Sequence, residues 1–257
     1  MREIRVPFDP LNPGQFFACC GLFDLAAHHD PEACAWFEGD ELLPRRALFV
    51  ISGRALPELK VILTALREAG VERLEHAEES IRPIALHIAG RRLELDWWLD
   101  EFRQETTNLK CWAGQVTTTK LFQELLPLLS EDVDEKTLMT AAAMTKSKFG
   151  IDPRSAWNAL DFGYSPNEHN KDAATYPAVE ILGAIGLQAF RPQAEQRDRV
   201  YYNLWEIPLP LAVARLAGTE GWKGLPLRRY SYSILKRGQS YKYFSPAEYV
   251  KRKSYYQ

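Results

Sequence analysis

Residues 12–29 read NPGQFFACCGLFDLAAHH and predict a long helix near the start of the chain. Asn12 is a suitable N-cap, and Pro13 suits the first helical position because its missing N–H would have no intrahelical partner there. Asp30-Pro31 predicts the end of the helix. Apolar side chains recur every three or four residues and predict one buried face: Phe16, Phe17, Cys20, Phe23 and Ala27.

The sequence around this helix predicts an α+β fold with a mixed or antiparallel sheet and a helical middle section. In region 1–105 we expect strands at 2–7 and 47–51, a helix at 56–69 and a β-hairpin at 84–97. Region 106–195 predicts helices at 118–129, 135–148 and 175–190; the last is apolar all round, with Gly183 and Gly186 allowing close packing. Region 196–257 predicts strands at 199–207 and 227–235, a short helix at 208–217 and a final helix from Ser245. We expect the three regions to form one compact unit.

Composition indicates a globular protein of the cytoplasm. The chain has 257 residues, of which 46% are hydrophobic and 26% charged. It has no apolar run of about 18 residues, so no transmembrane helix is expected, and its first residues do not resemble a signal peptide. The four cysteines are expected to be reduced and mostly buried.

Charge is distributed unevenly along the chain. The net charge is −2, but residues 228–257 hold eight Lys or Arg and one acid, so they carry +7 and the rest of the chain carries −9. Such a segregated basic end predicts a polyanionic partner. Seven tyrosines and one phenylalanine alternate with these cations, and aromatic rings stack on exposed bases while Lys and Arg neutralise phosphates.

The basic, tyrosine-rich end is therefore the first candidate nucleic-acid interface. Arg228, Tyr230 and Tyr232 would share one face of a strand, as in sheets that bind single strands. The predicted contacts are Arg228, Arg229, Tyr230, Tyr232, Lys236, Arg237, Lys242, Lys251, Arg252 and Lys253. The alternative is an edge strand that lysines protect from aggregation, with its tyrosines packed on the body of the protein.

A second candidate surface is the polar loop 161–170, with Lys146 and Lys148 before it. Asn side chains can read base edges and Lys can hold phosphate. The alternative is a surface loop whose Asn and Gly residues serve turn geometry.

Catalytic and metal-binding patterns are weak, and we expect no cofactor and no metal. Adjacent cysteines on one helix point about 100° apart and do not chelate a metal together. Cys111 lacks a protease signature, and the acids after the hairpin suit a helix start better than a Mg²⁺ site. Metal-independent RNA cleavage would need an acid–base pair. The residues weighed for these chemistries are Cys19, Cys20, Cys34, His28, His29, Cys111, His87, His169, Asp96, Asp100 and Glu101.

Four segments together resemble a known protein family. They are residues 12–22 (NPGQFFACCGL), 112–118 (WAGQVTT), 149–170 (FGIDPRSAWNALDFGYSPNEHN) and 175–192 (TYPAVEILGAIGLQAFRP). In this order and spacing they resemble CRISPR-associated proteins of type I-G systems, formerly type I-U, in the group equivalent to the large subunit of Cascade. The resemblance spans residues 8 to about 192 and extends more weakly to the aromatic C-terminus, and none of its motifs is catalytic.

The resemblance implies a non-catalytic subunit of an RNA-guided, DNA-targeting effector complex in antiviral defence. Guide pairing would supply most of the sequence specificity, and the subunit would contact the DNA beside the target, including a short flanking motif (PAM). The implied partners are other Cascade subunits, CRISPR RNA, target DNA and a helicase–nuclease that is recruited for cleavage. The chain is short for a large subunit.

Asn12 and Gln15 are the suggested contacts at the start of the first helix, with helix capping as their alternative role. Two other functions stay open from the residues. One is an endoribonuclease that processes CRISPR transcripts and uses His87 or His169. The other is a scaffold whose basic end binds an acidic protein.

Overall fold

The computed structural model describes residues 1–39, 47–113, 115–155, 173–192, 194–196, 199–221, 224–237 and 241–251, with the backbone alone at 194–196 and 237. About 30% of the chain is helix and 30% strand, and every strand pair in the described part is antiparallel, so the α+β prediction is confirmed. No helix among the described residues is both long and apolar enough to cross a membrane.

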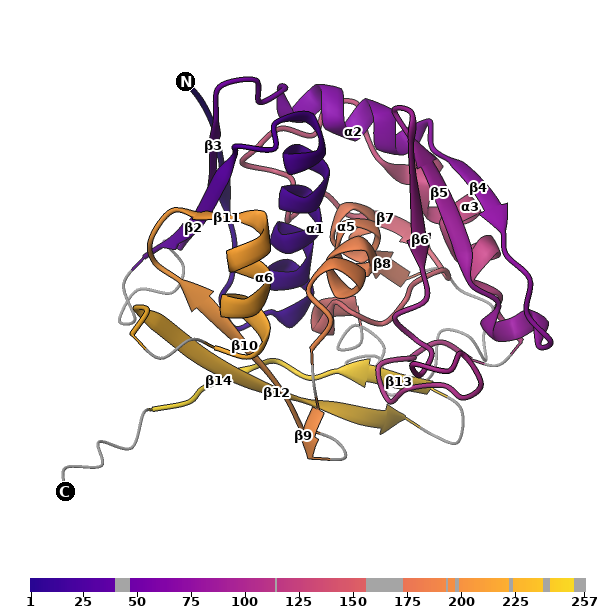
Figure 1. Cartoon of the computed structure of the whole chain (residues 1–257). Helices are drawn as coiled ribbons and strands as arrows, with labels where there is room; N and C mark the ends of the chain where they lie inside the picture. The colour runs from indigo at the N-terminus through magenta and orange to yellow at the C-terminus, as the bar shows by residue number, and fades with distance from the viewer. Residues whose placement is uncertain are drawn as a thin grey trace.

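Two central helices, α1 (Pro13–His29) and α5 (Pro177–Ala189), form the middle of the molecule (Figure 1). Both begin with proline at an N-terminal position, and Asn12 caps α1 by accepting from the Gln15 N–H at 3.1 Å. The helices pack backbone to backbone at a pair of glycines. A Cβ at Gly21 would lie 2.0 Å from Leu182 O, and one at Gly186 would lie 1.8 Å from Phe17 O. Only glycine therefore fits at this crossing.

The N-terminal sheet has the strand order β1-β3-β2-β11, formed by β1 (Arg2–Pro7), β3 (Leu48–Gly53), β2 (Cys34–Glu38) and β11 (Leu209–Pro210). Ile4 pairs with Ile51 and Val6 with Phe49, and all four side chains are buried in the core with α1. Because β11 comes from residues 209–210, this sheet joins the N-terminal region to the C-terminal region. Helix α6 (Leu211–Thr219) follows β11 directly.

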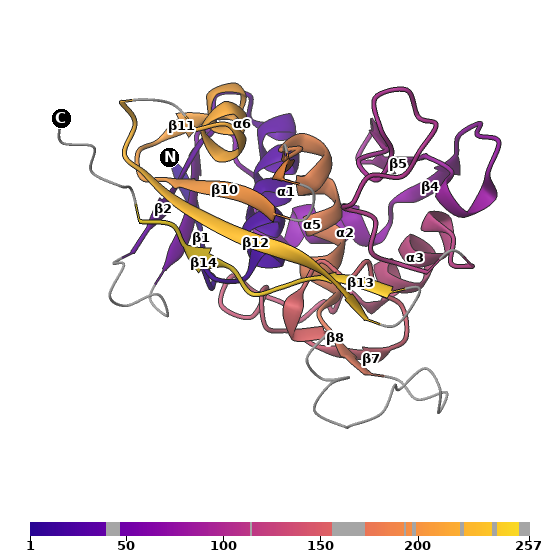
Figure 2. The ribbon, with the colours of Figure 1, turned by 90° about the horizontal axis from the view of Figure 1, so that it is seen from below.

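The C-terminal sheet has the order β13-β12-β10-β9, and β14 also pairs with β12. Its strands are β9 (Ala194–Gln196), β10 (Arg199–Trp205), β12 (Leu227–Arg237), β13 (Tyr241–Phe244) and β14 (Glu248–Tyr249). One face packs on α1 and α5. Figure 2 views the sheet from the opposite side, with both helices behind it.

The remaining described elements cover the far side of the central helices. Helix α2 (Leu59–Arg67) lies along the top of Figure 1, beside the sheet of β4 (Gly70–Arg73), β5 (Ile84–Ile88) and β6 (Arg91–Leu95). The 3₁₀ turn η2 (Glu79–Ile81) precedes β5, and the described part of the middle region contains α3 (Thr118–Leu125), η3 (Leu126–Leu128) and the short pair β7 (Ala143–Thr145) and β8 (Ala173–Thr175). Contacts such as Asn12 to Asp152 and Arg5 to Glu135 join regions that are distant in sequence.

Two predicted helices are wrong. Residues 135–148 form turns and strand β7, because Asp134 and Thr137 exchange hydrogen bonds in a closed turn: Thr137 N donates to Asp134 Oδ1 at 2.8 Å and Asp134 N donates to Thr137 Oγ1 at 2.9 Å. The final helix predicted from Ser245 is instead extended and ends in β14. Its backbone is held to β12, with Ser245 N donating to Ser233 O at 2.9 Å and Val250 N donating to Arg229 O at 2.8 Å.

A buried carboxylate on α5 fixes the loop 149–152. Both oxygens of Glu180 accept backbone N–H groups: Phe149 N at 2.7 Å, Gly150 N at 3.1 Å and Ile151 N at 3.5 Å bond to Oε2, and Asp152 N at 3.2 Å bonds to Oε1. Burial, with a smaller contribution from the charge of Asp152, raises the pKa of Glu180 to about 7. Because Asp152 also accepts from Asn12 Nδ2 at 3.0 Å, this loop connects the N-termini of the two central helices.

Candidate nucleic-acid interface

Strand β12 presents two unlike faces. Arg228, Tyr230, Tyr232 and Ile234 are each at most 6% exposed, so the face on which we predicted base stacking is directed into the protein. The prediction that Arg228, Tyr230 and Tyr232 share a face is confirmed, and their assignment as nucleic-acid contacts is wrong. Alternation along the strand places the opposite set of side chains outward.

The buried tyrosines hold the sheet on α1. Tyr202 stacks on Phe16 with ring centroids 4.4 Å apart and on Tyr230 at 5.5 Å, and its hydroxyl donates to Pro10 O at 2.5 Å. Tyr232 packs against Phe244 with the ring centroids 4.7 Å apart. Burial raises the pKa of Tyr202 and of Tyr232, so both remain neutral phenols. This is the packing role that the sequence left open for the tyrosines.

The Arg228 side chain is also buried and ion-paired. Its side chain is 6% exposed, and its Nε lies 2.6 Å from Oε1 of Glu206. A guanidinium that is buried and neutralised in this way cannot hold a phosphate without breaking its ion pair.

The outward face of β10, β12 and β13 carries a different set of aromatic and basic side chains, which we call the outer face. It is defined by Arg199, Tyr201, Arg229, Ser233, Leu235 and Tyr243. The guanidinium carbon of Arg229 lies 4.2 Å from the centroid of the Tyr201 ring, which is a cation–π contact. Leu235 is 41% exposed and lies opposite Tyr243, so an apolar and an aromatic side chain adjoin on the surface. No helix lies on this face in Figure 2.

Sequence reasoning missed Arg199 and Tyr201, and it included Tyr243 only among the aromatic residues of the basic end. The signal was the alternation in residues 199–207, where Val200, Tyr202 and Leu204 form the more apolar set and are expected inward. That choice places Tyr201 outward. The pairing of the strands then determines which side chains of β12 face inward, because Tyr202 lies opposite Tyr230 and the two share a face.

A lysine cluster lies at the end of the β12–β13 hairpin, where Lys236 and Lys242 alternate with Leu235 and Tyr243 and so lie on the side of the sheet opposite to the outer face. Lys236 pairs with Lys242 across the strands, and β13 is held by Lys242 N donating to Cys111 O at 3.1 Å. Like charges directly opposite in a sheet are destabilising. Lys110 adds a third cation; burial and then the charge of Lys242 lower its pKa, although Glu78 acts in the opposite direction. Within the described residues no ion pair involves Lys236 or Lys242.

Asn12 and Gln15 are wrong as nucleic-acid contacts. They are 2% and 4% exposed. Asn12 caps α1 and donates to Asp152, and Oε1 of Gln15 accepts from Asp9 N at 2.6 Å. Asn12 therefore has the capping role that the sequence offered as the alternative, and Gln15 holds the backbone before the helix.

The other predicted contacts have different fates. Lys148 is half-buried and donates to Ser155 O at 2.8 Å, which leaves its ammonium group fixed beside the protein backbone. Lys146 and Lys251 are exposed, with Lys146 just after β7 in a separate sheet. The Arg237 side chain, Arg252, Lys253 and the loop 161–170 lie outside the described residues.

Two of the residues considered for catalysis, His87 and Cys111, are engaged in other contacts. His87 Nε2 lies 2.7 Å from Glu72 Oε2, and the hydrogen bonds of Arg92 and His87 lower the pKa of Glu72. Burial raises the pKa of Cys111, whose thiol donates to Leu109 O at 3.3 Å, so a nucleophilic thiolate is disfavoured. His169 lies outside the described residues. Among the described residues, no group of three His, Cys, Asp or Glu side chains could hold a metal ion.

Comparisons with protein-family models, with curated proteins and with solved structures each give no match. The outer face and the lysine cluster are therefore interpreted from their own chemistry.

The inward assignment of Tyr232 predicts the effect of a conservative change. No described residue hydrogen-bonds the buried Tyr232 hydroxyl, so we expect Tyr232→Phe to leave the free energy of unfolding unchanged or to raise it by up to about 1 kcal/mol. Chemical denaturation would measure this, and nucleic-acid affinity should stay as in the wild type. A large loss of nucleic-acid affinity in a fully folded variant would show that Tyr232 is a nucleic-acid contact after all.

Proposed function

We propose that this chain is a non-catalytic, nucleic-acid-binding subunit of a type I CRISPR RNA-guided effector complex. It contacts CRISPR RNA or target DNA through the outer face and the lysine cluster, in the cytoplasm, and leaves cleavage to a separate helicase–nuclease. Two lines support this. The family resemblance of residues 8–192 suggests the kind of assembly, and the surface chemistry of residues 199–244 suggests the contact.

The observation that carries the proposal is the Arg229–Tyr201 stack on the outer face, over which no helix of the described residues lies (Figure 2). A guanidinium stacked on a ring presents a flat cation that can receive a base and also pair with a phosphate. Tyr243 and Leu235 extend an apolar floor on the same face, and sheets of this kind bind unpaired nucleotides. The like-charged pair of Lys236 and Lys242 gains stability when a phosphate lies between or beside them.

Charge reversal on the outer face tests the proposal. We expect Arg199→Glu/Arg229→Glu to weaken binding of a fluorescently labelled single-stranded oligonucleotide on the order of tenfold or more and to reduce the slope of log affinity against log salt by roughly 1.4, for two lost phosphate contacts. Fluorescence anisotropy at several salt concentrations measures both quantities, with RNA and DNA oligonucleotides tested separately.

A matched control carries the same change of charge elsewhere. Lys60→Glu/Arg73→Glu alters two exposed side chains on α2 and β4, on the opposite side of the molecule in Figure 1. Because this variant changes only the net charge of the protein, we expect its affinity to stay within about twofold of the wild-type affinity. Equal losses in the two double variants would show that only net charge matters, and the outer face would then not be the site.

A further inference from the structure

An exposed phenylalanine stands at the tip of the short loop 100–105. Phe102 is 78% exposed, more than any other large hydrophobic side chain in the described part except Met1. The loop is closed at its base by Thr107 N donating to Trp98 O at 2.8 Å and Asp100 N donating to Glu105 O at 2.9 Å. Burial of an exposed aromatic ring against a partner is favourable, because it removes a large apolar area from water.

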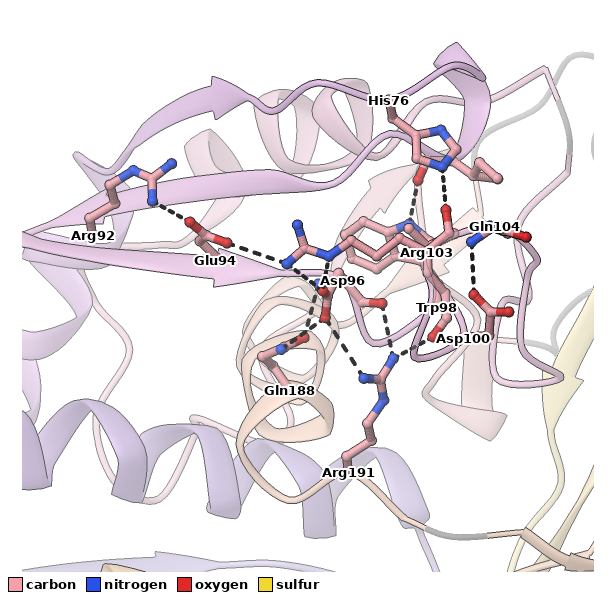
Figure 3. A network of polar contacts seen from close by, with 12 residues as sticks. His76, Arg92, Glu94, Asp96, Trp98, Asp100, Arg103, Gln104, Gln188 and Arg191 are labelled. Atoms are coloured by element: carbon pink, nitrogen blue, oxygen red, sulfur yellow. Dashed lines mark hydrogen bonds and ion pairs between the residues drawn. The ribbon is translucent and has the colours of Figure 1, made fainter.

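The loop around Phe102 is held by its own polar contacts (Figure 3). Asp100 Oδ1 accepts from Gln104 N at 2.8 Å and from Glu105 N at 3.3 Å. Arg103 has a positive φ of 55°, and its Nε donates to Asp96 Oδ2 at 2.8 Å. The Arg103 carbonyl oxygen lies 2.8 Å from His76 Nε2. A non-glycine residue in this conformation persists when its surroundings fix it.

The same network anchors the loop to the central helix α5. Gln188 makes two hydrogen bonds with Asp96: its Oε1 accepts from Asp96 N at 2.9 Å and its Nε2 donates to Asp96 Oδ1 at 3.1 Å. Arg191, just after α5, donates to Asp96 O at 3.1 Å and to Leu99 O. Figure 3 shows these side chains converging on the base of the loop from the end of the helix. Phe102 is therefore presented in a fixed position, which lowers the entropy cost of binding.

The charge around Phe102 selects the kind of partner. Asp100, Glu101 and Glu105 lie in the same short loop, and within the described residues none of them forms an ion pair, whereas Arg103 is neutralised by Asp96 and Glu94. An acidic border repels phosphates, so it opposes insertion of the ring between nucleic-acid bases. It fits a protein pocket with an apolar floor and a rim of Lys or Arg.

We propose that loop 100–105 is a docking knob that inserts Phe102 into an apolar, basic-rimmed pocket on another protein subunit. This proposal rests on the proposed function only for where that subunit is found, in the same effector complex. The knob is separate from the outer face, so one surface holds nucleic acid and the other holds the neighbouring protein. A buried aromatic anchor with a charged rim is the usual composition of an interface hot spot.

The test uses the chain co-expressed with the genes that adjoin its own and with a CRISPR array. The tagged complex is purified, treated with nuclease so that RNA does not tether subunits, and weighed by native mass spectrometry. We expect Phe102→Ala and Glu101→Lys/Glu105→Lys each to reduce the bound protein subunit at least tenfold, while Phe102→Trp retains it. Val61→Ala, which changes a 52% exposed residue on α2, is the matched control and should have no effect.

Each outcome is decisive. Because Phe102 is exposed, the melting temperature of Phe102→Ala should equal that of the wild type, which separates lost docking from lost folding. If Phe102→Ala retains the subunit as the wild type does, the knob is wrong and the proposed function stands. If Phe102→Ala instead weakens binding of the labelled oligonucleotide, the loop is a nucleic-acid contact and the protein pocket is wrong. A wild-type chain that carries no other subunit overturns both the docking knob and membership of a complex.

Discussion

Gly186→Ala is expected to lower the free energy of unfolding by about 3–5 kcal/mol. The new methyl carbon would lie 1.8 Å from the carbonyl oxygen of Phe17 and 2.9 Å from Gly21 N, so the two central helices would have to separate. Both contacts are to backbone, and no side-chain rotation relieves them. Helix propensity alone predicts the opposite sign, a gain of about 1 kcal/mol for alanine over glycine.

The control for this change lies one turn earlier on α5. A Cβ at Gly183 would lie 3.3 Å from Ile151 Cγ2 and 3.4 Å from Gly14 O, contacts that small adjustments accommodate. We expect Gly183→Ala to change the free energy of unfolding by less than about 1 kcal/mol, because the gain in helix propensity offsets slight crowding. Urea denaturation followed by circular dichroism compares the two variants. If Gly186→Ala were as stable as the wild type, the helices would not cross in backbone contact.

At pH 5, Glu180→Gln is expected to lower the free energy of unfolding by about 3 kcal/mol. The carboxylate accepts four backbone N–H groups from residues 149–152, and an amide nitrogen in place of either oxygen would direct a donor at another donor. The loop 149–152 would then lose its attachment to α5. Glu68→Gln is the matched control, because Glu68 is exposed and its replacement should cost less than about 0.5 kcal/mol.

The pH dependence of the Glu180 effect has a definite sign. Burial raises the pKa of Glu180 from 4.5 to about 7, so the folded state binds this proton more tightly than the unfolded state. The contribution of Glu180 to stability is fully present below about pH 4.5 and is lost as pH rises through about 7, a change of roughly 3 kcal/mol. Glu180→Gln lacks this slope, so the difference between wild type and variant should narrow from pH 5 to pH 8. A difference that widens over this range would contradict the assignment.

The central helices were predictable because local signals and burial agree. Asn12 and Pro13 mark the start of α1, and the apolar composition of residues 175–190 indicates a buried helix with glycines for close contact. The crossing of Gly21 with Gly186 was not predictable, because it depends on how two segments 165 residues apart pack. The turn at Asp134 and the extended chain after Ser245 were mispredicted for a related reason. Hydrogen bonds between Asp134 and Thr137 and from residues 245–250 to β12 outweigh helical propensity.

The side chains predicted as contacts on β12 are those of its buried face. Charge and aromatic content pointed to residues 228–237, but both sets of alternate residues contain a cation, so composition could not choose between them. Pairing with β10 makes the choice, because Val200, Tyr202 and Leu204 must face α1 and they bring Tyr230 and Tyr232 with them. The result replaces Arg228, Tyr230 and Tyr232 by Arg199, Tyr201 and Tyr243 as candidate contacts.

The central claim is that the outer face binds nucleic acid, and ultraviolet cross-linking followed by mass spectrometry tests it most directly. The full-length chain is irradiated with a bound single-stranded oligonucleotide and the modified residues are identified. We predict cross-links to Tyr201 and Tyr243 on the outer face, with none to the buried Tyr202, Tyr230 or Tyr232. Cross-links confined to other surfaces, such as α2 or the sheet of β4, β5 and β6, would contradict the proposed interface.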